Sequence, residues 1–130
     1  MGYKITGKGF TVCVKALLGA GADVDKITRV DGWTALMLAA KRGFTGCVKA
    51  LLAAGADADK AGDDGWTALM LAAQGRNADS VRVLLGAGVD VTIATNTGLT
   101  ALKIAETTVR HNDEVVALLR AAQPPPPRDD

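Results

Sequence analysis

The chain has 130 residues and a formal net charge of +1, from 15 Lys and Arg against 14 Asp and Glu. This length suits one domain, and the balanced charge argues against nucleic acid as a partner, because phosphate binding needs a surplus of cations on one face. Aromatic residues are only 4% of the chain, so we expect a core of Ala, Leu, Val and Met. No stretch approaches the roughly 18 apolar residues of a membrane span. We therefore expect no membrane contact and a cytoplasmic location, with the nucleus as the alternative.

An internal repeat dominates the chain. A ten-residue string recurs in three closely similar copies: Val14–Asp23, Val48–Asp57 and Val81–Asp90. Between these copies, Asp31–Ala40 returns unchanged as Asp64–Ala73, 33 positions later, and Gly98–Leu102 continues that series. A period of this length indicates stacked units, none of which can bury its apolar face alone.

Each period predicts two short helices. Thr34 suits the N-cap of the first, and the apolar run Leu36–Ala40 follows it. Gly43 suits a left-handed stop. Thr45 is then expected to cap a second helix that carries Val48, Leu51 and Leu52 and ends at Gly55. Neither helix is long enough to be stable alone in water, so each must pack on its neighbours.

These residues resemble the ankyrin-repeat family: Gly-x-Thr-x-Leu-x-x-Ala-Ala, Val-x-x-Leu-Leu and Gly-Ala-Asp stand at a 33-residue spacing over about residues 10–122. The resemblance implies an all-α solenoid of stacked helix-turn-helix units with β-turn fingers projecting at about right angles. It also implies that the concave face of fingers and first helices binds other proteins.

The repeats divide the chain into one domain and a tail. The domain covers residues 1–123, with a partial repeat at about 3–30 and full repeats at 31–63, 64–96 and 97–123. Nothing before Phe10 supplies a complete first helix, so the N-terminal edge lacks a polar cap, whereas Asp113, Glu114 and Arg120 resemble one at the other end. Residues 124–130 form a Pro-rich extended tail, which is either a linker or a ligand for a Pro-recognising module.

The sequence departs from the family's pattern in two ways. The usual Thr-Pro-Leu-His has Ala in place of Pro throughout, and its His is Met37, Met70 and Lys103. Lys103 is costly to bury, so we expect either a looser last repeat or a stem that reaches toward solvent. In the third repeat Gly75 stands one position early compared with Gly43, which predicts an unfavourable backbone conformation at Arg76.

Catalytic and metal-binding patterns are absent from the sequence. Ser80 and His111 are the only Ser and His, and they lie in different parts of the repeat pattern, so we expect no enzyme activity. Cys13 and Cys47 occupy equivalent positions and suit small buried residues rather than a zinc site or a disulfide. The recurring acids Asp23, Asp57 and Asp90 suit turn formation better than calcium binding. We expect no cofactor and no metal.

The candidate partner-binding residues lie at the finger positions. Trp33, Trp66 and Leu99 each follow the turn Gly. The resemblance implies that they point to the concave edge, where they would form an apolar ladder suited to partner contact. The alternative is that each side chain lies on the neighbouring finger and only stiffens the stack. The flanking candidates on the same face are Asp31, Lys41, Arg42, Asp63, Asp64, Gln74 and Thr107.

The sequence thus favours a non-catalytic module that binds another protein through its concave face, with a basic segment of that partner near Asp63 and Asp64. A second hypothesis is a structural spacer or a fragment of a longer array, which stacks or self-associates through the uncapped N-terminal edge. An enzyme is the third and least favoured class.

Overall fold

The computed structural model describes residues 33–108 and 113–123. Within them the chain forms consecutive helix pairs: α2 (Ala35–Arg42) with α3 (Thr45–Ala53), α4 (Ala68–Gln74) with α5 (Ala78–Gly86), and α6 (Ala101–Thr107) with α7 (Asp113–Ala121). The expected partial repeat, Asp31, His111 and the Pro-rich tail lie outside the described residues. No helix in the described part of the chain is long and apolar enough to cross a bilayer.

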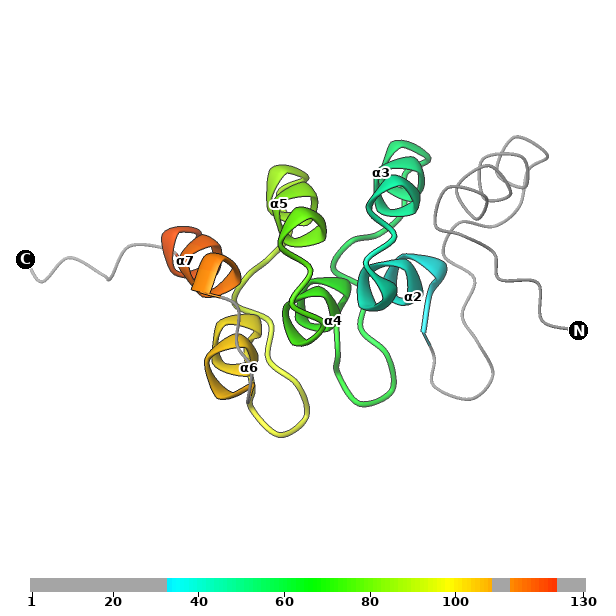
Figure 1. The fold of residues 1–130 in the computed structure, drawn as a ribbon. Helices are drawn as coiled ribbons and strands as arrows, with labels where there is room; N and C mark the ends of the chain where they lie inside the picture. Colours follow the sequence, from blue (N-terminus) through cyan, green and yellow to red (C-terminus); the bar gives the residue numbers. More distant parts are fainter. Residues whose placement is uncertain (1–32, 109–112, 124–130) are drawn as a thin grey trace, which may run out of the picture.

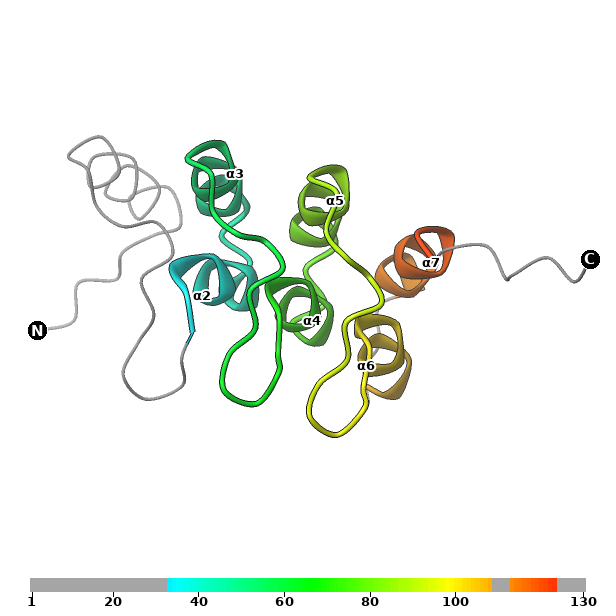
Figure 2. The same cartoon turned by 180° about the vertical axis from the view of Figure 1, so that it is seen from behind.

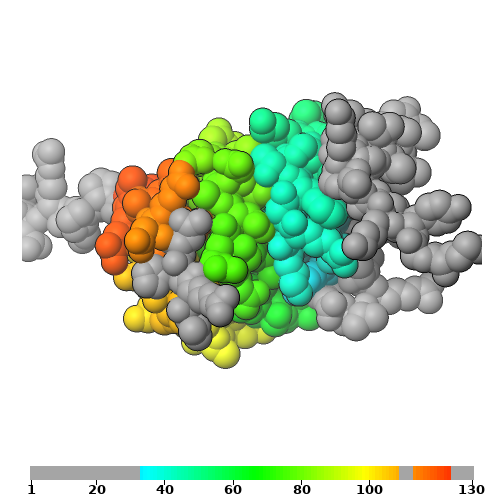
Figure 3. Space-filling model, viewed as in Figure 1, coloured from blue at the N-terminus to red at the C-terminus, as the bar shows by residue number. Residues whose placement is uncertain are grey.

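The helices form two layers (Figure 1). One layer holds α2, α4 and α6, and the other holds α3, α5 and α7; neighbours within each layer are in contact. The loops that join one pair to the next project beyond the first layer as fingers, which Figure 2 shows from behind. In the space-filling view the pairs appear as successive bands in sequence order (Figure 3). This is the solenoid of stacked helix pairs expected from the sequence.

The core lies between the layers and repeats with the sequence. In the first helix of the first described pair, Leu36, Met37, Ala39 and Ala40 are all buried, and the same positions of α4 are buried too. The Ala side chains are small enough for α2 and α4 to pack closely. In the second layer, Val48 and Leu51 of α3 are buried as predicted, whereas Leu52 is only partly buried. The helices are therefore held by contacts with adjacent pairs, as short helices require.

A threonine precedes and caps the first helix of each pair. The Oγ1 atoms of Thr34, Thr67 and Thr100 each accept a hydrogen bond from the backbone N–H three residues later. These contacts satisfy donors that the first helical turn leaves without a partner. The predicted cap at Thr34 is confirmed, and Thr67 and Thr100 cap the equivalent helices in the same way. At Thr67 the backbone N–H also donates to the Sδ atom of Met70, 3.4 Å away.

The predicted cap at Thr45 is wrong. Phe44 is the N-cap of α3, and Thr45 is already its first helical residue. The left-handed Gly43 ends α2, and the Phe44 N–H bonds the carbonyl of Ala39 (2.9 Å), so the chain turns within two residues. The hydroxyl of Thr45 instead pairs with that of the buried Ser80 in α5 (3.2 Å). It links two repeats rather than capping its own helix.

The turn between α4 and α5 has the same hydrogen bonds with a different residue in the left-handed position. Arg76 has φ +58°, where the first described turn has Gly43 at φ +73°. The N–H groups of Arg76 and Asn77 bond the carbonyls of Ala73 (3.1 Å) and Ala72 (3.0 Å), which closes the helix end. The predicted backbone strain at Arg76 is confirmed. A non-glycine residue there costs about 1–2 kcal/mol.

Asn77 explains why the glycine stands one position early. Its Nδ2 donates to the carbonyls of Ala40 (2.9 Å) and Lys41 (3.2 Å) at the end of α2. A Cβ at residue 75 would stand 2.7 Å from that same Nδ2, and a Cβ at Gly43 would stand 2.8 Å from Oδ1. The Asn77 side chain therefore lies between two glycines. It caps the preceding repeat and makes no side-chain cap for its own helix.

Replacing Arg76 by glycine should stabilise the protein. Relief of the left-handed strain outweighs the extra freedom that glycine gives the unfolded chain, for a net gain of about 1 kcal/mol in the free energy of unfolding. Arg42→Gly is the matched control, because Arg42 is an exposed helical residue. This substitution should lower the free energy of unfolding by about 0.5–1 kcal/mol. Urea unfolding of both variants measures whether each substitution raises or lowers the free energy of unfolding. A loss in Arg76→Gly would show that the Arg76 side chain contributes more than the strain costs.

The last repeat has exposed polar side chains at positions that are buried in the preceding repeat. Lys103 and Glu106 are exposed, and they correspond to the buried Met70 and Ala73 of α4. Glu106 also forms an ion pair with Arg120 of α7 (3.1 Å). Lys103 thus reaches solvent as expected.

Candidate functional site

Each described finger is a tight hairpin that ends at a candidate residue. In the first, the Gly62 N–H bonds the Trp66 carbonyl and the Gly65 N–H bonds the Gly62 carbonyl, both at 2.9 Å. In the second, Thr95 makes the same two contacts with Leu99 and Gly98, both at 2.8 Å. The expected β-turn fingers are present, and they hold Trp66 and Leu99 at equivalent places immediately before Thr67 and Thr100.

The two fingers are bonded to each other. The backbone N–H of Asn96 donates to the Asp64 carbonyl (3.1 Å), and its Nδ2 donates to the Asp63 carbonyl (3.1 Å). A Cβ at Gly65 would stand 2.9 Å from the Asn96 nitrogen, so the fingers also pack without a gap. The first described finger is therefore held in place before any partner arrives. The sequence did not predict this link by Asn96.

The ladder residues are half-buried. Trp33, Trp66 and Leu99 are all partly exposed and all pack against the hydrophobic core. Each side chain thus stiffens its repeat and also presents apolar surface beside the fingers. Both interpretations of the ladder therefore stay open, because packing against the core can stiffen the stack while the partly exposed residues leave room for partner contact.

The flanking residues differ from repeat to repeat. Lys41 is exposed, and its Nζ lies 4.9 Å from the centre of the Trp33 ring. Gln74 and Thr107 stand at the equivalent positions of the next repeats and are exposed. The Thr107 hydroxyl donates to the Lys103 carbonyl within its own helix (2.8 Å). The charge on this side of the first helices thus falls from one repeat to the next.

The remaining flanking candidates are also exposed: Arg42, Asp63 and Asp64. The Asp64 Oδ1 accepts a hydrogen bond from the Trp66 N–H (3.2 Å), which fixes this carboxylate beside the backbone of the ladder residue. Asp31 lies outside the described residues. The structure therefore brings candidates of both charges to the finger and first-helix side of the stack.

The recurring aspartates shape the finger bases, as predicted for turn residues. Asp57 Oδ1 accepts from the Asp59 N–H (3.0 Å), and Asp59 accepts in turn from the Asp90 N–H of the next repeat (2.8 Å). The hydroxyl and the N–H of Thr92 donate to Asp90 and hold its pKa below the ordinary value of 3.8. That contribution to stability is present above pH 3.8 and is lost as the pH falls through the lowered pKa.

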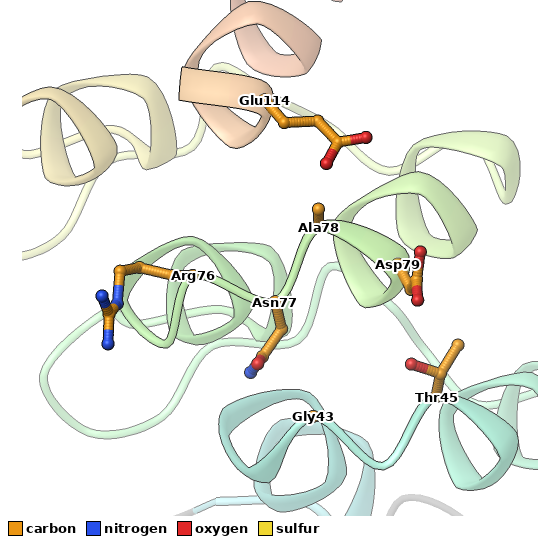
Figure 4. A pocket seen from close by; sticks show the side chains of 7 residues that line it. All are labelled: Gly43, Thr45, Arg76, Asn77, Ala78, Asp79 and Glu114. Carbon is orange, nitrogen blue, oxygen red and sulfur yellow. The ribbon is translucent and has the colours of Figure 1, made fainter. Parts of the chain in front are cut away.

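A polar cleft of about 300 Å³ lies at the helix-turn side of the stack, away from the finger ladder (Figure 4). Its walls come from the two helix turns and the start of α7: Gly43, Thr45, Arg76, Asn77, Ala78, Asp79 and Glu114. Asn77 points toward Gly43 and Arg76 points away from the other side chains. Arg82 forms ion pairs with both Asp79 and Glu114. The Arg82–Glu114 pair thus joins α5 to α7, whereas the Arg82–Asp79 pair lies within α5.

In the described part of the chain, no group of three or more His, Cys, Asp or Glu side chains could hold a metal ion. Cys47 is buried, as predicted for a small core residue. Cys13 lies outside the described residues. The finger and first-helix side is therefore the place where exposed apolar and charged groups combine.

Comparison with known families agrees with this geometry. Residues 5–95 and 64–125 match the family model described as ankyrin repeats (3 copies). The chain belongs to the ankyrin-repeat family. A search of the curated proteins found no match. Ankyrin repeats are generally protein–protein interaction modules, and the family is generally non-enzymatic. The all-α repeat fold expected from the sequence is thus confirmed.

Proposed function

We propose that this ankyrin-repeat protein is a non-catalytic module that binds another protein through the face formed by its fingers and first helices. Trp33, Trp66 and Leu99 supply the apolar contacts at the centre of that face. The exposed charges beside them select the partner. The proposal needs no cofactor, metal or nucleic acid.

The observation that carries this proposal is the combination of exposed aromatic surface with a fixed backbone. Trp33 and Trp66 remain partly exposed although each packs against the core, and Trp is the residue most enriched among interface hot spots. The hydrogen bonds from Asn96 to the Asp63 and Asp64 carbonyls hold the finger in one conformation. Binding to such a preorganised surface loses little conformational entropy.

The Trp33→Ala/Trp66→Ala double variant tests the proposal. We expect it to lose its protein partner, with affinity falling by about tenfold or more, because truncating buried interface aromatics is the costliest class of change at interfaces. The measurement is a pull-down from source-cell lysate read by mass spectrometry, followed by titration of the identified partner. Far-ultraviolet circular dichroism checks that the variant still folds.

A control variant and two contrasting outcomes make the test decisive. Lys49→Ala is the matched control, because Lys49 is exposed on α3 in the other layer and its loss should leave capture unchanged. A partner that binds the wild type and the folded double variant equally contradicts a concave-face function. Capture of nothing except further copies of the chain would favour the spacer or array-fragment hypothesis.

A further inference from the structure

The repeats place different groups beside equivalent rings. In the first described repeat, the Lys41 ammonium lies 4.9 Å from the centre of the Trp33 ring, within the range where a cation is attracted to an aromatic face. The residue that corresponds to Lys41 beside Trp66 is Gln74. Within residues 33–108 and 113–123, the one cation over a Trp ring is Lys41. The chain thus places a cation at Trp33 and an uncharged amide side chain at the corresponding position of the Trp66 repeat.

The surroundings of Trp66 are acidic. Asp63 and Asp64 are both exposed in the turn that leads into Trp66, and the Asp64 carboxylate accepts a hydrogen bond from the backbone N–H of Trp66. The corresponding turn residues of the next finger are Asn96 and Thr97, which carry no charge. Of the two fingers that the structure describes in full, the first alone therefore combines an aromatic residue with two carboxylates.

We propose that Trp66, Asp63 and Asp64 form the site at which this face takes a lysine or arginine side chain of its protein partner. The inference rests on the function proposed above and names the chemistry of the partner. The aromatic face attracts the cation and the two carboxylates complement its charge. The Lys41–Trp33 pair in the same chain shows the geometry that the partner side chain would reproduce at Trp66.

The backbone of this site is already ordered. Asn96 bonds the carbonyls of both Asp63 and Asp64, so their carboxylates extend from a fixed turn. A partner cation therefore meets two charges that need little rearrangement. Because both carboxylates are exposed, added salt should weaken binding.

Nuclear magnetic resonance of the whole ¹⁵N-labelled chain tests the site. The sequence contains only two Trp, so two indole N–H signals report on the two rings. The probe is N-acetyl-lysine N-methylamide, and its control is the norleucine analogue, which has a similar chain and no charge. We expect the Trp66 indole and the amides of residues 63–66 to shift saturably with the lysine probe, with a dissociation constant of roughly 1–10 mM. Equal shifts with norleucine would overturn the proposal.

Gln74→Lys should close the site. The new lysine stands where Lys41 stands relative to Trp33, so it should occupy the Trp66 ring and abolish the lysine-dependent shift. Ala53→Lys is the matched control, because Ala53 is exposed at the end of α3 in the other layer, so it adds the same charge away from Trp66 and should leave the lysine-dependent shift unchanged. Asp63→Asn/Asp64→Asn should weaken binding about threefold or more and reduce its salt dependence. Wild-type binding in folded Gln74→Lys would contradict the inference.

Experiments with the protein partner distinguish the cation site at Trp66 from the broader proposed function. If the folded Trp33→Ala/Trp66→Ala variant loses the partner while the lysine probe leaves the Trp66 signal unmoved, the face binds proteins but the cation site is wrong. If the probe binds and Gln74→Lys also weakens capture of the partner by about threefold or more, the cation site is used in the complex. If Gln74→Lys captures the partner as the wild type does, a lysine or arginine of that partner does not bind at Trp66.

Discussion

Leu84→Ala should lower the free energy of unfolding by about 3 kcal/mol. Leu84 is fully buried in α5, and α5 packs against both α3 and α7. Removing its side chain leaves a cavity that these short helices can close only in part. Urea unfolding followed by circular dichroism at the helical band measures the loss as a shift of the midpoint.

The neighbouring residue provides the control. Leu85 is only partly buried, so Leu85→Ala opens little internal space and should cost about 1 kcal/mol. Because repeats contact only their neighbours, a cavity in the middle pair weakens both of its interfaces. We therefore expect Leu84→Ala to broaden the unfolding transition as well as to shift it. Equal losses in the two variants would mean that α5 is rotated relative to the packing described here.

The burial pattern could be predicted from sequence because it depends on local spacing. The apolar positions of α2 recur 33 residues later in α4, and helical periodicity places them on one face. Thr34 and Thr67 were recognisable as caps for the same reason, since each bonds an N–H only three residues away. The strain at Arg76 was visible as a glycine displaced by one position.

The links between repeats could not be predicted in this way. Asn77 bonds carbonyls 36 and 37 positions earlier, and Thr45 meets Ser80 across 35 positions. In both cases a residue type that ordinarily caps its own helix contacts another repeat instead. Sequence periodicity aligns equivalent residues, but it does not state which side chains reach across the stack.

The candidate face likewise combines features that the sequence predicts with features that it does not. The finger positions of Trp66 and Leu99 follow from the turn glycines that precede them, so the sequence locates them. Their half-burial depends on how the side chains pack. The Lys41–Trp33 contact joins residues at the two ends of one helix, and only the structure shows that the pair meets.

Gly65→Ala should destabilise the protein by about 3 kcal/mol and loosen the first described finger. Gly65 has φ +83°, where an L side chain costs about 1–2 kcal/mol. A Cβ there would also stand 2.9 Å from the Asn96 nitrogen and 3.1 Å from the Thr95 Cα. These are backbone atoms of the next finger, so the clash can be relieved only by separating the fingers, at a further cost of about 1–3 kcal/mol.

Gly98→Ala isolates that second cost. Gly98 has almost the same backbone angle, φ +85°, and a Cβ there would meet nothing within 4 Å, so its substitution should cost only the strain of about 1–2 kcal/mol. The difference between the two variants in urea unfolding measures how tightly the fingers are joined. If the proposed function is correct, Gly65→Ala should also weaken partner binding more than Gly98→Ala, because it frees the turn that carries Asp63 and Asp64. Equal losses of stability would show that the fingers move apart without cost, and the preorganisation on which the proposed binding face depends would then be absent.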